Sequence, residues 1–211
     1  MTITFYDYKM APSPRRARII LAEKNVPHEN IQIDMMTGAQ FSDAYRAINP
    51  NCTIPALKLD DGSILTDNAG IAVYLEDTYP DPPLMGRTPL EKAEVATWQS
   101  KLELGFSMAV AHAYRNTNPD MKNRALPGPN NYEQIPALSE RGLKQIDDFF
   151  EMFEKHIEGR EFIAGDHISI ADITAACTFD FAKAVGKRIT DEMTNTKRWK
   201  DGLKQRPSFR A

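Results

Sequence analysis

The apolar side chains at the start of the chain are spaced first as in a strand, then as in a helix, and then as in a strand again. Residues 3–6 alternate in the manner of a short strand. A helix is predicted from about residue 14 to residue 24, with an apolar face made of Ala17, Ile20 and Leu21. The segment 25–27 ends this helix, and Ile31 and Ile33 indicate a second strand.

Residues 56–66 carry a hairpin signal. Two short apolar runs, 56–59 and 63–66, are separated by Asp60-Asp61-Gly62, and Asp-Gly between such runs is typical of a tight turn. A helix then begins at Asp67-Asn68, and its apolar positions are Ile71, Ala72, Leu75 and Tyr79. A strand–helix–strand unit followed by a hairpin and a helix is the order of a thioredoxin-like sheet, so we expect a βαβαββα domain here.

The densest proline cluster in the chain, at residues 79–83, separates two kinds of pattern. Upstream of it, strands alternate with helices, and downstream only helical periodicity is found. We therefore interpret the cluster as a linker. The predicted fold class is α/β plus all-α, with a thioredoxin-like domain over residues 1–80 and an all-helical domain over residues 87–211.

Three apolar stripes at helical spacing are found in the second domain. The first follows Pro89 and consists of Val95, Trp98, Leu102, Phe106, Ala109 and Ala113. The second consists of Ile146, Phe149, Phe150, Phe153 and Ile157, and the third of Ile170, Ile173, Cys177, Phe181 and Ala184. At the start of the third helix, Ser169 and Asp172 have the spacing of a capping box.

Two features beside the hairpin suit a small zwitterionic peptide as ligand. Pro55 cannot donate to a sheet, and a cis bond at this strand entrance would turn the peptide groups of Ile54 outward to pair with another backbone. Asp67 and Asn68 form a polar pair at a helix N-terminus, which is suited to a carboxylate beside free backbone N–H groups.

In their order and spacing, these motifs resemble the glutathione-binding half of the cytosolic glutathione transferases. They are N-P-x-x-x-I-P-A-L at residues 49–57, the D-G turn, and an acidic–polar pair followed by A-x-I-x-x-Y-L. The chain is similar to bacterial members of that family over nearly its whole length. The resemblance implies an enzyme that activates the thiol of glutathione, its co-substrate, for attack on a small hydrophobic electrophile. It also implies a homodimer.

The resemblance implies a set of glutathione-binding residues, namely Gln40, Thr53, Ile54, Pro55, Asp67 and Asn68. In this set the backbone of Ile54 pairs with the cysteinyl part of the peptide. Asp67 holds the ammonium of the γ-glutamyl group, and Asn68 takes its carboxylate. Gln40 and Thr53 are candidates for the glycyl end, although a solvated side chain at a helix start is an equally good interpretation of Gln40.

Ser13 is the predicted catalytic residue. A cysteine-type thiol has a pKa near roughly 8.5, so it needs a donor that stabilises the thiolate at neutral pH. Because Ser13 precedes Pro14, and proline favours the first helical position, Ser13 is the expected N-cap with its hydroxyl at the mouth of the helix. The resemblance is to classes with a serine or threonine in this loop. The alternative donor to the thiolate is Tyr8 or a backbone amide near Ala11. Without a catalytic role, Ser13 would be an ordinary helix cap. Tyr6 is expected to pack within the strand.

Other polar residues have weaker assignments. Arg15, Arg16 and Arg18 are expected to be solvated on the face of the first helix, and electrostatic steering of an anionic thiolate or carboxylate by one of them is the alternative. The residues proposed to line a second-substrate site are Tyr8, Met108, His112 and Arg115, and core or surface packing is an equally good interpretation of the last three. The histidines show no metal-ligand spacing, so no metal is expected.

Composition and charge narrow the functional classes. With 42% hydrophobic and 26% charged residues, the 211-residue chain has the composition of a soluble globular protein. A net charge of −3 gives no reason to expect nucleic acid or an anionic membrane as partner. No apolar run approaches the roughly 20 residues of a membrane span, and the N-terminus lacks the features of a signal peptide. Cys52 and Cys177 form no CxxC motif, so we expect a cytoplasmic protein.

Two other functions remain open at this point. One is a glutathione-dependent disulfide or peroxide reductase, which would use the same binding residues. The other is a non-catalytic module of the same fold that serves in protein interaction or ligand storage.

Overall fold

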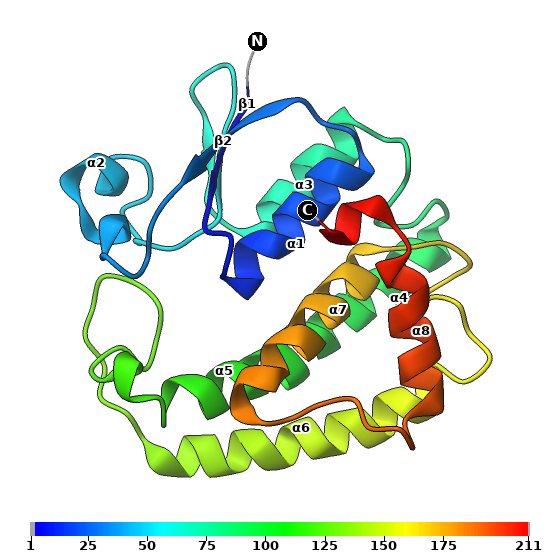
Figure 1. The fold of residues 1–211 in the computed structure, drawn as a ribbon. Coiled ribbons are helices and arrows are strands. Elements are labelled where there is room, and N and C mark those ends of the chain that lie inside the picture. Colours follow the sequence, from blue (N-terminus) through cyan, green and yellow to red (C-terminus); the bar gives the residue numbers. More distant parts are fainter. Residues whose placement is uncertain (1–2, 211) are drawn as a thin grey trace. The chain divides into compact units, whose positions relative to one another are not determined.

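The structure is a computed structural model that describes residues 3–210 as two compact units (Figure 1). Unit 1 takes in residues 3–82 and 127–130, and unit 2 takes in residues 83–126 and 131–210. Within residues 3–210, no helix is long and apolar enough to cross a membrane.

Unit 1 is built on a four-stranded sheet with the strand order β2-β1-β3-β4. Its elements are β1 (Ile3–Asp7), α1 (Pro12–Glu23), β2 (His28–Gln32), η1 (Ala39–Phe41), α2 (Asp43–Arg46), β3 (Ala56–Lys58), β4 (Ile64–Leu65) and α3 (Asn68–Thr78). β1 pairs in parallel with β2 and antiparallel with β3, which pairs antiparallel with β4. The predicted βαβαββα order is confirmed, although α1 begins earlier than predicted and β4 is shorter.

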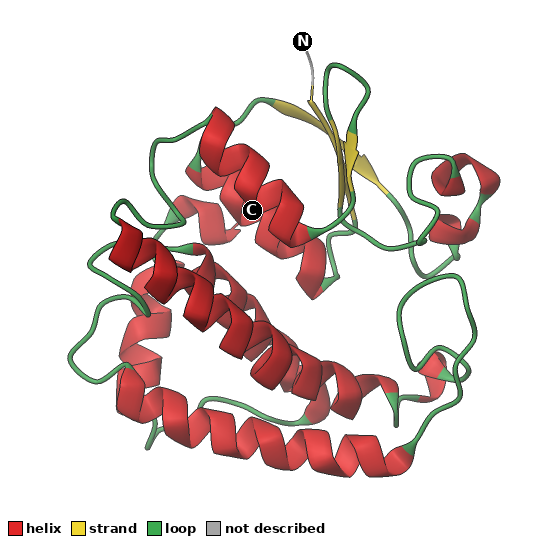
Figure 2. Ribbon diagram, turned by 180° about the vertical axis from the view of Figure 1, so that it is seen from behind, coloured by secondary structure: helices red, strands yellow, loops and turns green. Residues whose placement is uncertain are grey.

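The helices of unit 1 cover both faces of the sheet. α1 and α3 lie together on one face, and α2 lies on the other (Figure 2). Lys24, just after α1, is buried, and its Nζ donates to the carbonyl oxygens of Tyr79 at 2.7 Å and Pro82 at 2.8 Å. The same Nζ forms an ion pair with Glu76 of α3 at 2.8 Å. This lysine therefore fixes the end of α1 against the end of α3.

Unit 2 is helical throughout its regular elements. They are α4 (Pro89–Ser100), the π-helical η2 (Lys101–Ser107), α5 (Met108–Arg115), η3 (Pro119–Met121), α6 (Pro136–His156), α7 (Ile170–Ala182), η4 (Lys183–Val185), α8 (Thr194–Lys204) and η5 (Pro207–Arg210). The first two predicted stripes are buried in full, whereas Ala184 of the third lies beyond α7 and is exposed.

α5 and α6 run side by side in both ribbon views (Figures 1 and 2). They approach closely at Gly142, where an added Cβ would lie 2.6 Å from the carbonyl oxygen of Ala109. Only a glycine fits this contact without displacing one of the helices.

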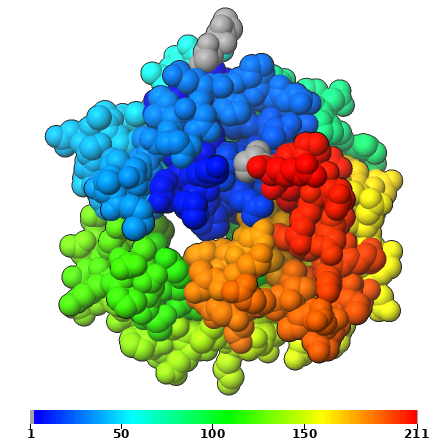
Figure 3. Space-filling view, in the orientation of Figure 1, coloured from blue at the N-terminus to red at the C-terminus, as the bar shows by residue number. Residues whose placement is uncertain are grey.

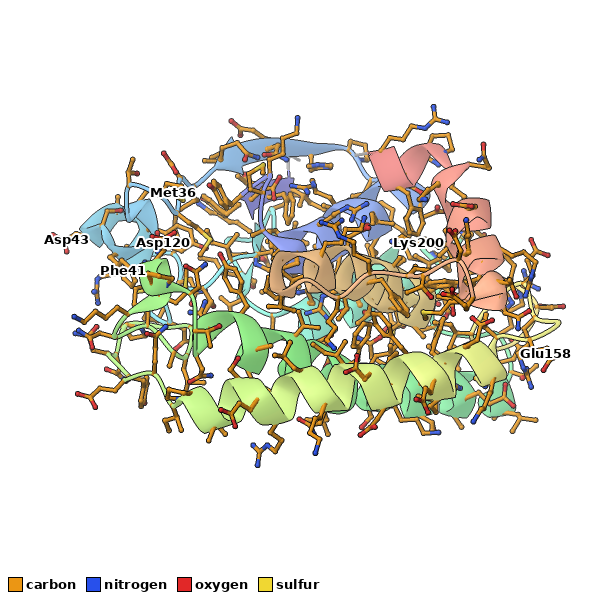
Figure 4. The ribbon with its side chains drawn as sticks, turned by 60° about the horizontal axis from the view of Figure 1, so that its bottom comes forward. Met36, Phe41, Asp43, Asp120, Glu158 and Lys200 are labelled. Atoms are coloured by element: carbon orange, nitrogen blue, oxygen red, sulfur yellow. The ribbon has the colours of Figure 1, made fainter. Side chains whose placement is uncertain are left out.

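The predicted capping box of α7 is confirmed. The buried Asp172 carboxylate accepts from the Ser169 amide and hydroxyl at 3.0 Å each, and from the Trp199 indole N–H at 2.9 Å. A further link between α7 and α8 is made by Lys200, labelled on α8 in Figure 4, whose Nζ donates to Asp180 at 2.9 Å.

Candidate functional site

The N-terminus of α1 differs from the prediction in one respect. Ala11 is the N-cap and Pro12 the first helical residue, so the prediction that Ser13 caps the helix is wrong. Pro12 suits the first helical position as well as Pro14 does, because both have a fixed φ and no N–H. As a result Ser13 lies inside the first turn, and it carries the only backbone N–H among residues 12–14. The deep blue part of unit 1, which is the beginning of the described residues, is visible on the face shown in Figure 3.

Ser13 meets a predicted binding residue. The amide nitrogen Nδ2 of Asn68, the first residue of α3, donates to Ser13 Oγ at 2.9 Å. Asn68 is only 8% exposed, and its Oδ1 has no hydrogen-bond partner among residues 3–210. Asp67 is the N-cap of α3 and accepts from the Ala69 amide at 2.8 Å. The structure thus brings together Ser13 and Asn68 at the N-termini of two packed helices.

The strand entrance at Ile54-Pro55 has the predicted cis peptide bond. Within residues 3–210, the backbone N–H and C=O of Ile54 make no hydrogen bond. The preceding carbonyl, that of Thr53, accepts from the Tyr45 hydroxyl at 2.7 Å and from Asn49 Nδ2 at 2.8 Å. Burial raises the pKa of Tyr45 well above its ordinary value, so this hydroxyl remains a donor at neutral pH. Thr53 is therefore held from behind while the Ile54 peptide groups stay available.

Gln40 lies in η1 and is completely buried, which rules out the interpretation as a solvated side chain. The next residue, Phe41, is labelled in Figure 4. Among residues 3–210, neither the nitrogen nor the oxygen of the Gln40 carboxamide has a partner. A buried amide in this state costs free energy until a polar partner reaches it. Its role at the glycyl end of glutathione stays a prediction.

A buried polar network lies beneath the loop that leads into α1. Arg18 Nη1 donates to both carboxylate oxygens of Asp7 at 2.8 Å, and the two side chains are 9% and 1% exposed. Asp7 also accepts from Asn30 at 3.3 Å and from Gln32 at 2.9 Å. Lys9 is held at both its peptide groups, since its N–H donates to Gln32 Oε1 at 3.0 Å and its carbonyl accepts from Arg18 at 3.2 Å.

The sequence pattern does not predict this network. The prediction that Arg18 is solvated is wrong, because Arg18 faces the sheet, where Asp7 at the end of β1 supplies a counter-charge. A carboxylate that ends a buried strand, with an arginine on the following helix, is the signal that could have indicated the pair.

The candidate second-substrate residues are divided between the two units. Tyr8 is half-buried in unit 1 and packs against a cluster that contains Tyr6, Tyr45 and Ile54. Tyr6 is buried, as predicted.

Met108, His112 and Arg115 lie on α5 in unit 2. Burial lowers the pKa of His112, and the nearby Arg141 lowers it further. Burial also lowers the pKa of Arg115, whose guanidinium donates to the Met121 sulfur at 3.6 Å. The role of these three residues stays a prediction. Within residues 3–210, no group of three or more His, Cys, Asp or Glu side chains is placed to hold a metal ion.

Comparisons with known proteins match both units of the chain to one family. Residues 11–78 match the glutathione S-transferase N-terminal domain, and residues 95–207 match the glutathione S-transferase C-terminal domain. Glutathione S-transferase 2 of Saccharomyces cerevisiae is 30% identical over 210 residues, which are 97% of this chain and 87% of that protein. FtsZ-localized protein A of Caulobacter vibrioides is 24% identical over 98% of this chain and 89% of its own length.

A solved structure extends the likeness to the fold. The crystal structure of a glutathione S-transferase domain-containing protein from Marinobacter aquaeolei superposes with a TM-score of 0.87 at 28% identity, over 98% of this chain and 99% of that one. The two domain matches together span most of the sequence, in the order that the two units have along the chain. The chain belongs to the glutathione S-transferase family.

Proposed function

We propose that unit 1 binds glutathione and ionises its thiol for transfer to a small hydrophobic electrophile. The observation that carries this proposal is the hydrogen bond of 2.9 Å between Asn68 and Ser13. It joins the N-termini of α1 and α3, and both ends carry the partial positive charge that stabilises an anion. Glutathione brings two anionic groups to such a site, its γ-glutamyl carboxylate and its thiolate.

The peptide is held along its length by the residues that the sequence predicted. The unpaired backbone of Ile54 takes the cysteinyl peptide group in strand-like hydrogen bonds. Asp67, exposed at the N-cap of α3, attracts the γ-glutamyl ammonium, and Asn68 with the first amides of α3 takes the carboxylate. Gln40 and Thr53 serve the glycyl carboxylate at the other end.

Ser13 stabilises the thiolate. A hydrogen bond to a charged group contributes about 1.5–3 kcal/mol, which lowers the pKa of a thiol by about one to two units. Because the hydroxyl of Ser13 accepts from Asn68, its own proton remains for the sulfur. The Ser13 backbone N–H adds a second donor in the same turn. The residues proposed to contact the electrophile are Tyr8 in unit 1 and, separately, Met108, His112 and Arg115 in unit 2.

We also propose that the protein is a homodimer and that it is located in the cytoplasm. The likeness to the glutathione S-transferase family supports the dimer, and Leu104 of η2, which is 72% exposed, offers apolar surface that a second copy of the chain would cover. In the cytoplasm glutathione keeps thiols reduced, which suits the two free cysteines. Light scattering at micromolar concentration should give the mass of two chains, and the mass of one chain would contradict the dimer.

Calorimetric titration with glutathione, followed by parallel assays, tests the function. We expect binding and faster turnover with an aryl halide or epoxide than with hydroxyethyl disulfide. Disulfide reduction faster by an order of magnitude would instead indicate a reductase. The absence of both binding and turnover would favour a non-catalytic module. This outcome is included because FtsZ-localized protein A, one of the similar proteins, is named for its localisation with another protein and not for an enzymatic activity.

A further inference from the structure

We propose that Asn68 is a positioning residue, which directs the Ser13 proton toward the thiol and does so most effectively when a γ-glutamyl ammonium is bound. This inference rests on the proposed function, because it assumes that Ser13 faces the sulfur of glutathione. It assigns to Asn68 a part in thiol activation in addition to its part in holding the peptide.

The direction of the Ser13 proton follows from which atoms can donate. Nδ2 of Asn68 carries only donor hydrogens, so Ser13 Oγ must be the acceptor in the bond of 2.9 Å. A serine hydroxyl has one proton, which then points to a second acceptor. If the carboxamide were turned by half a turn, Oδ1 would face Ser13 and take that proton. Ser13 would then have nothing to donate to a thiolate.

The other end of the carboxamide indicates what selects the active orientation. Asn68 is only 8% exposed, and its Oδ1 is buried without a hydrogen-bond partner among residues 3–210. An acceptor in this state favours a donor that arrives with the ligand. The γ-glutamyl ammonium is such a donor, and it lies at the end of glutathione that the α3 N-terminus is proposed to bind. An ammonium on Oδ1 keeps Nδ2 turned toward Ser13.

A capping role does not account for Asn68. The cap of α3 is supplied by Asp67, which already accepts from the Ala69 amide. A buried carboxamide with one end unsatisfied destabilises the fold relative to an apolar residue of similar size. The side chain is therefore better explained by a ligand than by the stability of α3.

The test measures the pKa of bound glutathione by thiolate absorbance, and its affinity by calorimetry, in a double-mutant cycle. The variants are Asn68→Ala, Asn68→Asp, Ser13→Ala and the Ser13→Ala/Asn68→Ala pair. Asn131→Ala, in an exposed loop of unit 2, is the matched control. A thermal unfolding curve is measured for each variant to check that it is folded.

We expect Asn68→Ala to raise the pKa of the bound thiol by roughly half a unit to one unit, because the Ser13 hydroxyl loses its orientation. Asn68→Asp should raise it further, since a carboxylate accepts the Ser13 proton and adds a like charge beside the thiolate. In the Ser13→Ala background, Asn68→Ala should cause no additional shift. Glutathione acylated at its α-amino group, at saturation, should show a raised pKa in the parent and no further rise in Asn68→Ala.

The contrary outcomes separate this inference from the function on which it rests. An equal pKa shift from Asn68→Ala with and without Ser13, or a change in affinity alone, would overturn the positioning role and leave glutathione activation by Ser13 intact. A pKa that Ser13→Ala does not change would overturn both the catalytic role of Ser13 and this inference. Failure of the parent to bind glutathione would contradict the proposed function itself.

Discussion

Replacing Arg18 by methionine should destabilise unit 1 strongly. The change keeps an unbranched apolar stem but removes the guanidinium, so it leaves the Asp7 carboxylate buried at 1% exposure without its counter-ion. Removal of one partner of a buried ion pair costs about 3–5 kcal/mol. Asp7 retains the amide donors of Asn30 and Gln32 at 3.3 and 2.9 Å, so we expect a loss near the lower end, about 3 kcal/mol.

The assay must report on unit 1, because both tryptophans, Trp98 and Trp199, lie in unit 2. Amide hydrogen exchange in the strands during a urea series gives the free energy of unfolding of unit 1 directly. The matched control is Arg188→Met, at an exposed position of unit 2, where the change should be within about 0.5 kcal/mol. The double variant Asp7→Asn/Arg18→Met should lose less than the sum of the two single changes.

A loss below about 1 kcal/mol in Arg18→Met would refute this reasoning, since that is the range of exposed pairs. Additive losses in the double variant would refute it as well. Because Arg18 also holds the Lys9 carbonyl, the same variant should loosen the loop before α1 and slow turnover more than it weakens glutathione binding.

Three further changes test separate parts of the account. Gly142→Ala should lower the free energy of unfolding by about 1–3 kcal/mol, because the new Cβ would lie 2.6 Å from a carbonyl oxygen of α5. The control Gly202→Ala, whose Cβ would have nothing within 4 Å, should be neutral or stabilising in thermal unfolding. Burial raises the pKa of Glu154, but hydrogen bonds from the start of α8 outweigh this effect and hold the pKa below the ordinary 4.5. The Glu154 carboxylate therefore stabilises unit 2 above pH 4.5, and this stabilisation is lost as the pH falls below that value. Glu154→Gln should flatten this decline in acid unfolding, and an unchanged decline would contradict the assignment. Asp67→Ala should weaken glutathione binding in calorimetry while leaving the pKa of the bound thiol nearly unchanged, and a large pKa shift would show that Asp67 acts on the sulfur.

The fold could be predicted from the sequence because local patterns and packing agree along most of the chain. The stripes of α4 to α6 and the Ser169–Asp172 box depend on spacing alone, and spacing determines which side of a helix is buried. The start of α1 could not be fixed in this way. Pro12 and Pro14 each satisfy the preference for proline at the first helical position, and the choice between them depends on the turn from Tyr8 to Ala11, where the Ala11 amide donates to the Tyr8 carbonyl at 3.0 Å.

The candidate site could be predicted only in part, for a related reason. Motif order located Ile54, Asp67 and Asn68, because the hairpin and the helix after it are adjacent in the sequence. The contact between Asn68 and Ser13, and the pair of Arg18 with Asp7, join residues from different elements. The first contact leaves no local pattern, since it exists only after α1 and α3 have packed together. The second leaves only the combination of a carboxylate at the end of a strand and an arginine on the next helix.

The central claim is that Ser13 holds the thiolate of bound glutathione, and ultraviolet titration of the binary complex tests it most directly. The parent should show thiolate absorbance with a pKa about one to two units below that of the free thiol. Ser13→Ala should bind glutathione with nearly the same affinity but titrate close to the free thiol, retaining only the part due to the backbone N–H of residue 13. A Ser13→Ala complex that titrates like the parent would contradict the claim and assign the sulfur to Tyr8 or to a backbone amide near Ala11.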